Sequence, residues 1–352
     1  MARARVGYAC AYTPLAVIEA AGFTPHRILP MGQVPDRAGQ VLHDNLCRHV
    51  KLVLDRAVAG DMPDLSGLVL MSSCDAMRRL RDAWVDQCPD IPCTLVELPG
   101  SASPKSERFF EGQIQNLAAT LRSWGGQPVE TSNLSRLVGE YNKAADLFRQ
   151  LERAVAGGLL VGGASQLQKL YNKACTLPVK DAVLLLENAA CQPTQEPTPA
   201  TPMFLFGNVL PDPDAMGLFE QCGVRIVGAD MCTGSRAFTS VQGAFDGDPT
   251  AALARGLLGK APCARTLSDT GPGALAAHVV EQAQATGAAG VICHTLKFCD
   301  PYLFRIPRVQ DELRKAGVPM LVLEGDCTLG SLGQQRTRIE AFVETLEGTD
   351  VA

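Results

Sequence analysis

The chain has 352 residues, enough for about two domains, and 46% of them are hydrophobic, which is typical of a globular protein. It carries 32 basic and 37 acidic residues, a formal net charge of −5, and lacks the basic excess that non-specific nucleic-acid binding requires. No apolar run approaches the roughly 20 residues of a membrane span, and the N-terminus has no continuous apolar signal segment. We therefore expect a cytoplasmic protein that binds neither nucleic acid nor membranes.

Strand and helix patterns alternate in the first third of the chain. The predicted strands are 5–10, 68–71 and 92–97, and the predicted helices are 15–22, 47–56 and 76–84. Because this alternation is typical of a parallel sheet covered on both faces, we expect a doubly wound α/β domain over residues 1–104.

Helical periodicity replaces the alternation from residue 105 to residue 190, and we interpret this part as a helical segment associated with the first domain. Four prolines then fall within the 12 residues 191–202, which predicts a linker because such a stretch suits neither helix nor sheet.

The alternation of strand and helix patterns resumes over 203–352, which predicts a second α/β domain. The predicted strands there are 203–206, 224–227, 290–293 and 318–324, and the predicted helices are 214–221 and 308–316. The expected fold is therefore α/β, with two similar doubly wound parallel-sheet domains and a helical insertion, rather than one extended sheet.

The number of cysteines is unusual. The chain has 13, an odd count scattered without a signal peptide, which does not indicate a disulfide framework. In a reducing compartment the remaining roles are buried inert thiols, a redox thiol or soft-metal ligands. No Cys-x-x-Cys pair is present, so neither a zinc ribbon nor a ferredoxin-type cluster run is encoded.

Three of these cysteines stand where a parallel-sheet protein binds ligands. Cys74 directly follows the strand 68–71 at the start of a helix, and Cys299 lies a few residues past the strand 290–293. Cys47 begins the helix 47–56. Ligands of open parallel sheets bind at the carboxyl ends of strands, and helix N-termini stabilise thiolates. Spacing alone is weak evidence, yet these three are the candidate ligands.

Several segments in sequence order resemble a known family. They are GYACAYTP at 7–14, IEAAG at 18–22, SSCDAMRRL at 72–80, GADMCTGSR at 228–236, LKFCDP at 296–301 and GQQRTRIEAF at 333–342. Together they cover the chain from about residue 5 to residue 345, and they resemble the iron–sulfur subunits of the 2-hydroxyacyl-CoA dehydratases and benzoyl-CoA reductases.

The resemblance implies a [4Fe–4S] cluster between the two domains, held by Cys47, Cys74 and Cys299. Three thiolates leave one iron without a protein ligand, and an open metal position is one that can bind substrate. In such enzymes a separate ATP-dependent iron–sulfur activator delivers one low-potential electron. The electron reduces the thioester carbonyl of a 2-hydroxyacyl-CoA to a ketyl radical, which expels hydroxide, and relatives reduce an aromatic acyl-CoA instead. The implied partners are therefore an acyl-CoA substrate, the activator, and a homologous second subunit or a second copy of the chain.

The resemblance also leaves alternatives open. A related branch carries a double-cubane [8Fe–9S] cluster that reduces small molecules, and Cys293 and Cys327 are extra thiols expected near the cluster. The chain can also be a non-catalytic subunit that relays electrons or assists assembly. Because members of the family often pair as two similar subunits, either role in such a pair is possible.

His294 and Lys297 border Cys299 and are candidates for a proton carrier or a hydrogen-bond donor at the site. A histidine at a strand end is more often held by a local hydrogen bond, so the residue that transfers protons stays unassigned. Cys10 and Cys222 are expected in the core. Cys232 lies in a loop whose residues 233–236 form either a structural turn, the favoured interpretation, or an anion-binding nest for a CoA phosphate.

Overall fold

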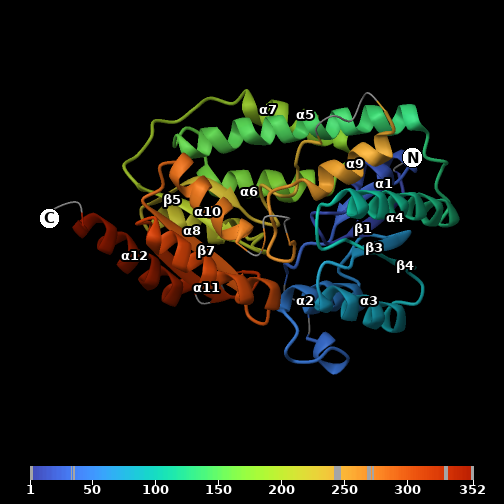
Figure 1. The fold of residues 1–352 in the computed structure, drawn as a ribbon, viewed down its shortest axis with the longest axis horizontal. Helices are drawn as coiled ribbons and strands as arrows, with labels where there is room; N and C mark the ends of the chain where they lie inside the picture. The colour runs from blue at the N-terminus through green and yellow to red at the C-terminus, as the bar shows by residue number, and fades with distance from the viewer. Residues whose placement is uncertain are drawn as a thin grey trace.

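Two parallel sheets of four strands form the framework of the molecule (Figure 1). The structure, a computed structural model, describes residues 3–32, 34, 36–241, 247–267, 271, 273–328 and 332–349. The first sheet has the strand order β2-β1-β3-β4 and the second the order β6-β5-β7-β8, so the same winding occurs twice. The strands are β1 (Arg5–Tyr8), β2 (Thr24–Arg27), β3 (Gly67–Met71) and β4 (Cys93–Val96), then β5 (Thr201–Gly207), β6 (Val224–Asp230), β7 (Gly290–Leu296) and β8 (Met320–Gly325).

Helices cover both faces of each sheet. In the first half these are α1 (Leu15–Ala20), α2 (Arg48–Val58), α3 (Asp75–Gln87) and α4 (Pro104–Ser123), followed by α5 (Thr131–Ala156), α6 (Gly163–Ala174) and α7 (Val179–Ala190). In the second half they are α8 (Pro213–Gln221), α9 (Pro249–Leu258), α10 (Ala274–Ala285), α11 (Asp300–Lys315) and α12 (Leu332–Thr349). None of these described helices is both long and apolar enough to cross a bilayer.

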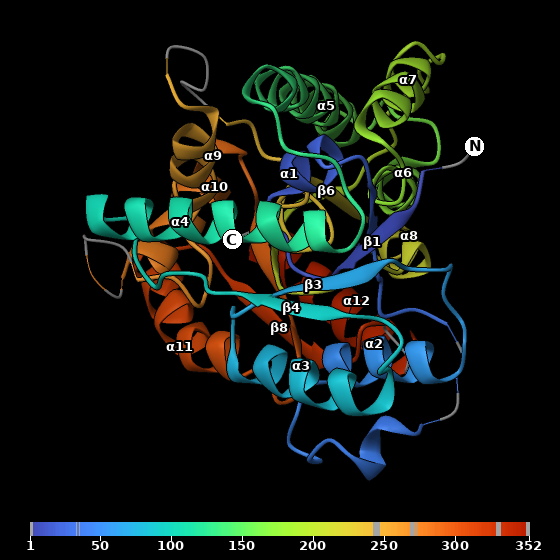
Figure 2. The same cartoon turned by 90° about the vertical axis from the view of Figure 1, so that its right-hand side faces the viewer.

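Strand β3 shows why the first sheet is buried on both faces. All five of its residues are buried. Leu68 and Leu70 pack in one core cluster with Trp84 of α3, whereas Val69 and Met71 point the other way into a second cluster with Phe110 of α4. Figure 2 shows the corresponding layers, with α2 and α3 on one side of β3 and β4 and with α1 and α4 on the other. The continuous apolar run is thus explained by helices on both faces.

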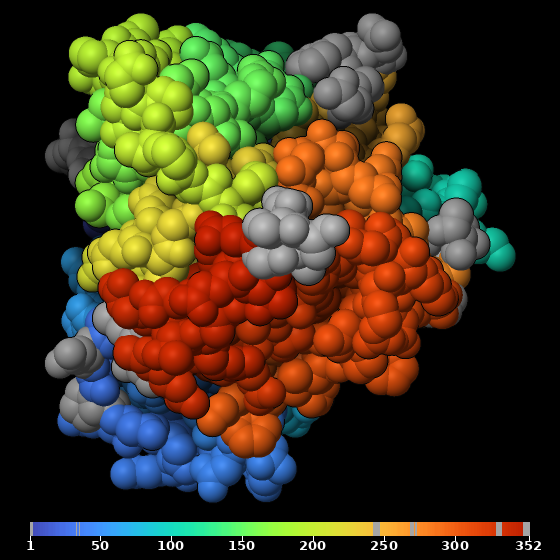
Figure 3. Space-filling model, turned by 90° about the vertical axis from the view of Figure 1, so that its left-hand side faces the viewer, coloured from blue at the N-terminus to red at the C-terminus, as the bar shows by residue number. Residues whose placement is uncertain are grey.

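The second sheet is built in the same way. Phe204 and Phe206 of β5 pack against α10 and α11, and the alternate residues Met203 and Leu205 face the opposite core. The helical segment α5–α7 shares that larger core, where Phe148 of α5 stacks on Tyr171 of α6 with ring centroids 4.0 Å apart. These green helices lie across the top of both halves in Figure 1. Figure 3 shows the C-terminal half, in orange and red, between the helical segment and the blue N-terminal half.

The α/β fold with two similar parallel-sheet halves is confirmed, and several boundaries differ from expectation. Strand β2, with the sequence TPHR, and the helices α9 and α10 were not predicted. The helix predicted at 308–316 begins at Asp300 instead. A proline normally interrupts a helix, so the sequence favoured a start after Pro307, but Pro307 lies inside this helix. Strand β7 continues through the polar His294 and Thr295 to Leu296, so Cys299 follows its end more closely than expected.

Candidate metal centre

The repeated strand order places one cavity between the two sheets. In each sheet the order reverses between the first and third strands, β1 and β3 in one and β5 and β7 in the other, and ligands bind at such a switch point outside the carboxyl ends. Residues that follow all four strands line the same cavity, namely Cys10, Ser73, Asn208 and Cys299. Its volume is about 830 Å³, part of which is open to solvent.

All three cysteines predicted as ligands line this cavity and occupy the same kind of position. Cys47, Cys74 and Cys299 are the N-cap residues of α2, α3 and α11, respectively. Each therefore stands at the positive end of a helix dipole, which lowers the energy of a thiolate there. Cys47 is buried, and the other two are partly exposed.

The three thiols influence one another. Burial raises the pKa of Cys47, of Cys74 and of Cys299 to about 11 in each case. A thiolate at one of these cysteines raises the pKa of another further. Cys74 raises that of Cys47, Cys299 raises that of Cys74, and Cys47 raises that of Cys299. These effects agree with the position of the three cysteines on one cavity. A cation bound among them reverses the preference and removes the protons.

Backbone N–H groups favour the anionic form at each of these cysteines. The amide of the third residue of the helix opposes the effect of burial on the thiol pKa: Val50 for Cys47, Met77 for Cys74 and Tyr302 for Cys299. These N–H groups belong to the first turn of each helix, where an amide has no carbonyl four residues earlier in the helix to donate to. The Tyr302 amide also donates to the Cys299 carbonyl at 3.1 Å.

The same three cysteines also line a wider hollow at the surface, about 1350 Å³ including open solvent. Phe298 and Phe304 border it with 47% and 79% of their surface exposed. Phe298 has a φ of 61°, a strained left-handed conformation for an aromatic residue, directly before the N-cap Cys299. Cys47, Cys74 and Cys299 thus stand between the interior cavity and the surface hollow, and we call them the outer cysteines.

The cavity is basic. It is lined by Arg27, Arg236, Lys260 and Arg265, and no aspartate or glutamate is among the described residues that line it. Burial of Lys260 lowers its pKa to about 8. The hydroxyl groups of Tyr12 and Tyr302 and the Nη1 group of Arg27 are buried without a hydrogen-bond partner. Buried donors without acceptors are costly, so this lining suits an anionic, acceptor-rich group.

The donor set consists of three thiols at helix N-termini that line one cavity, and thiolates are the ligands of iron–sulfur clusters. Ligands of one ion share a single centre, whereas three thiolates that hold a cubane bind three different iron atoms and stand farther apart. Three converging cysteines supported by helix N–H groups and cations therefore fit an iron–sulfur cluster.

The other candidates taken from the sequence lie elsewhere. His294 is completely buried in β7, where burial lowers its pKa to about 4, and Lys297 is exposed beside a different surface pocket. Neither lines the cavity. Cys293 and Cys327 are also fully buried, and neither lines the cavity. Burial raises the pKa of Cys327, and a thiolate at the nearby Cys47 raises it further.

Sequence reasoning missed several residues of the cavity. Cys222 is buried as expected, but Cys10 and Cys232 are partly exposed and line the cavity, as does Cys263. The structural-turn interpretation at 233–236 is consistent with the hydrogen bonds, because Thr233 Oγ1 accepts from the Leu210 amide at 3.0 Å. Cys10 follows strand β1 in the same way that Cys74 follows strand β3. This repeated position is the sequence feature that could have identified Cys10 as a residue of the cavity.

A two-domain α/β protein with a basic, cysteine-lined cavity between facing parallel sheets is the class that the fold and site define. The family model described as 2-hydroxyglutaryl-CoA dehydratase, D-component, matches residues 10–346, and the chain belongs to this family. The family expected from the motifs is thereby confirmed.

Relatives align along nearly their whole length. The beta subunit of lactoyl-CoA dehydratase from Anaerotignum propionicum is 24% identical over 347 residues, covering 97% of this chain and 91% of that protein. The beta subunit of (R)-phenyllactyl-CoA dehydratase from Clostridium sporogenes is 24% identical over 343 residues, with 95% and 90% covered. A subunit of benzoyl-CoA reductase from Thauera aromatica is 20% identical over 355 residues, with 97% and 90% covered.

Proposed function

We propose that this chain is a subunit of an acyl-CoA dehydratase or reductase and that Cys47, Cys74 and Cys299 hold a [4Fe–4S] cluster. The observation that carries the proposal is the convergence of three helix-start cysteines, each affecting the pKa of another, in a basic cavity. The names of the relatives supply the reaction class: two are dehydratase subunits and one is a reductase subunit.

The residues of this chain place and stabilise the group. When bound, such a cluster supplies a low-potential electron to a thioester and keeps one iron available to substrate. The helix N–H groups at Val50, Met77 and Tyr302 stabilise the thiolates. Arg27 and Lys260 offset their negative charge inside the cavity.

The surface hollow is the route by which we propose that acyl-CoA reaches the outer cysteines. Arg78, Arg265 and Arg305 line it and suit the phosphates of CoA, whereas Phe298 and Phe304 offer apolar contact. Since all three relatives are named as single subunits of their enzymes, we also propose that the chain works with a homologous second subunit or with a second copy of itself. An ATP-dependent iron–sulfur activator is the proposed electron donor.

The test is electron paramagnetic resonance of the anaerobically purified, dithionite-reduced chain, with and without acyl-CoA. We expect lactoyl-CoA, (R)-phenyllactyl-CoA or benzoyl-CoA to shift the cluster signal in a saturable way, and free CoA to leave it nearly unchanged. The matched control is Cys222→Ser, which alters a buried cysteine outside the cavity and should behave like the wild type. A cluster signal that none of the three thioesters changes contradicts the proposal.

A further inference from the structure

A second, smaller pocket adjoins the interior cavity, with a volume of about 410 Å³ including open solvent. It lies between α1, α5, α9 and the loop after β6, and we call it the side pocket. The apolar and aromatic residues that form its walls include Leu15 of α1, Val138 and Tyr141 of α5, Phe238 of the loop, and Leu253 and Leu257 of α9.

The side pocket and the interior cavity share part of their walls. Ala11 and Lys260 line both. In the loop after β6, Arg236 lines the cavity and its neighbour Ala237 lines the side pocket. The side pocket therefore lies next to the cavity, along the same segments of the chain.

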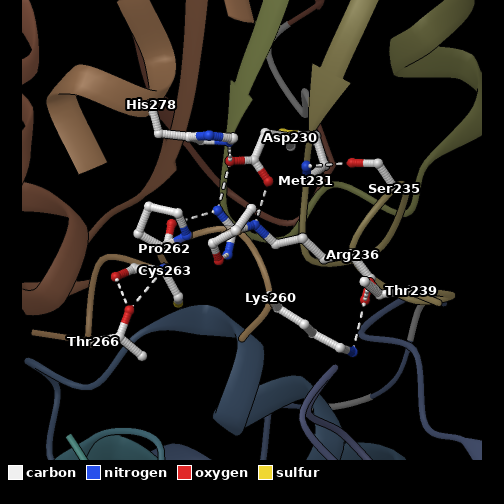
Figure 4. A network of polar contacts seen from close by, with 11 residues as sticks. Asp230, Met231, Ser235, Arg236, Thr239, Lys260, Pro262, Cys263, Thr266 and His278 are labelled. Atoms are coloured by element: carbon white, nitrogen blue, oxygen red, sulfur yellow. Dashed lines mark hydrogen bonds and ion pairs between the residues drawn. The ribbon is translucent and has the colours of Figure 1, made fainter. Parts of the chain in front are cut away.

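Lys260 stands at the boundary between the two spaces. Its Nζ group donates to the Ala11 carbonyl at 2.9 Å and to the Arg236 carbonyl at 3.5 Å (Figure 4). The charged end of this side chain is thus held by backbone carbonyls from both halves of the molecule. The methylene groups behind it present an apolar surface to a ligand that passes the boundary.

The polar side chains of the side pocket already have partners. Thr13 Oγ1 and Thr239 Oγ1 each donate to the carbonyl three residues earlier, at 2.8 and 3.5 Å. The Tyr141 hydroxyl donates to the Glu19 carboxylate at 3.2 Å. Among the described residues that line the side pocket, every polar side chain is therefore hydrogen-bonded, and the pocket suits an apolar group.

The interior cavity offers the opposite chemistry. The hydroxyl groups of Tyr12 and Tyr302 and the Nη1 group of Arg27 are buried there without hydrogen-bond partners. Buried donors of this kind favour a ligand that brings acceptor oxygens. The two spaces together therefore suit one amphipathic ligand, with its oxygens in the cavity and its apolar end in the side pocket.

Hydrogen bonds hold the walls of the side pocket in place. The Asn142 side chain of α5 accepts from the Val241 amide at 2.7 Å and donates to the Val241 carbonyl at 3.0 Å. Arg236 donates to the carbonyls of Ala261 and Pro262 at 3.2 and 2.8 Å, which fixes the segment after Lys260 (Figure 4). Because the walls are fixed in this way, a ligand spends little of its binding energy on ordering them.

We propose that the side pocket binds the apolar end of the acyl group and that Leu253 and Leu257 limit its length. The proposal rests on the proposed function and deepens it by naming the substrate class, an acyl-CoA with an elongated apolar acyl group. The thioester lies in the interior cavity at the outer cysteines. The end of the acyl group passes the methylene groups of Lys260 and reaches the side pocket.

The experiment measures the Kd of acyl-CoA thioesters by isothermal titration calorimetry on the anaerobically purified chain with its metal retained and no reductant added. The probes are propionyl-, butanoyl-, hexanoyl- and octanoyl-CoA, with free CoA as the baseline. In the wild type, each methylene group that enters the side pocket should tighten binding about three- to fourfold. The affinity should stop rising once the pocket is full.

Two substitutions at Leu257 should act in opposite directions. Leu257→Trp fills the side pocket and should abolish the gain from a longer acyl group, while propionyl-CoA still binds as in the wild type. Leu257→Ala enlarges the pocket and should move the limit to a longer thioester. The matched control is Leu167→Trp, the same change in a separate pocket that shares no described residue with the cavity or the side pocket. It should keep the wild-type series, and circular dichroism confirms that each variant is folded.

The outcomes separate this inference from the proposed function. Thioesters that bind equally well whatever their length, or a Leu257→Trp variant that keeps the wild-type series, overturn the acyl site and leave the cluster proposal in place. Binding of none of the thioesters overturns both proposals. If Leu257→Trp does not fold, Leu257→Ala decides, because an unmoved length limit in that variant overturns the role of Leu257.

Discussion

Replacing Arg236 by methionine should destabilise the metal-free protein by about 3–5 kcal/mol, the usual cost of leaving one partner of a buried ion pair unpaired. Arg236 and Asp230 are each only 6% exposed in their side chains, and Nε and Nη2 of the guanidinium bind the two carboxylate oxygens. His278 lies 3.6 Å from the same carboxylate. Without the guanidinium, a carboxylate would remain in a buried site beside one histidine.

The pH dependence of this loss follows from the titration of Asp230. Burial raises the pKa of Asp230, but Arg236 and His278 more than offset this, so its net pKa is lowered. In the wild type the pair therefore contributes stability that is present above the unfolded-state pKa of about 3.9 and is lost as the pH falls through the folded value. In Arg236→Met the carboxyl pKa should rise instead. The difference between the two proteins should then shrink as the pH is lowered from 7 toward 4.

The assay is urea unfolding of the apo protein, followed by circular dichroism at pH 7 and at pH 4.5. The double variant Asp230→Asn, Arg236→Met is the matched control, because it removes the unpaired charge. It should recover part of the loss, leaving about 1–3 kcal/mol for the lost hydrogen bonds to Ala261 and Pro262. A loss below about 1 kcal/mol in the single variant, or a double variant less stable than the single one, would refute the reasoning.

Two further substitutions test other parts of the account. Lys260→Met should stabilise the apo protein at pH 7 by up to about 3 kcal/mol, because burial lowers the pKa of Lys260 to about 8 and its protonation opposes folding. This gain should fade in urea titrations between pH 8 and about 10.5, and a gain independent of pH would count against the buried charge. Gly67→Ala should cost about 1–3 kcal/mol in thermal unfolding, since its Cβ would lie 2.4 Å from the Trp124 ring. Gly112→Ala, in α4 with open space around it, should instead be neutral or stabilising.

The sequence was most informative where one pattern had one explanation. The apolar run at 68–71 could only be a buried strand, and α3 follows it from Asp75 with Cys74 as its N-cap. Strand β2 was missed because Pro25 and the polar His26 do not resemble a strand; only its pairing with β1 makes it one. Helices α9 and α10 contain several alanines, so their apolar faces are weakly marked.

The site was predicted in part. The positions of Cys74 and Cys299 at strand ends followed from local pattern, and Cys47 from a helix start. Their meeting at one cavity depends on how the two halves pack, which no local pattern contains. For the same reason Cys10 was assigned to the core: its alanine neighbours describe a packed strand end, and only the opposing domain, with Lys260 bound to the Ala11 carbonyl, shows the cavity.

The most direct test of the central claim is the iron content of anaerobically prepared single variants at the outer cysteines. Cys47→Ser, Cys74→Ser and Cys299→Ser should each lose most of the iron that the wild type binds, together with its visible absorption, while the exposed, distant Cys191→Ser keeps both. Wild-type iron content in all three outer variants would contradict the account, because the converging thiols would then not be what holds the metal.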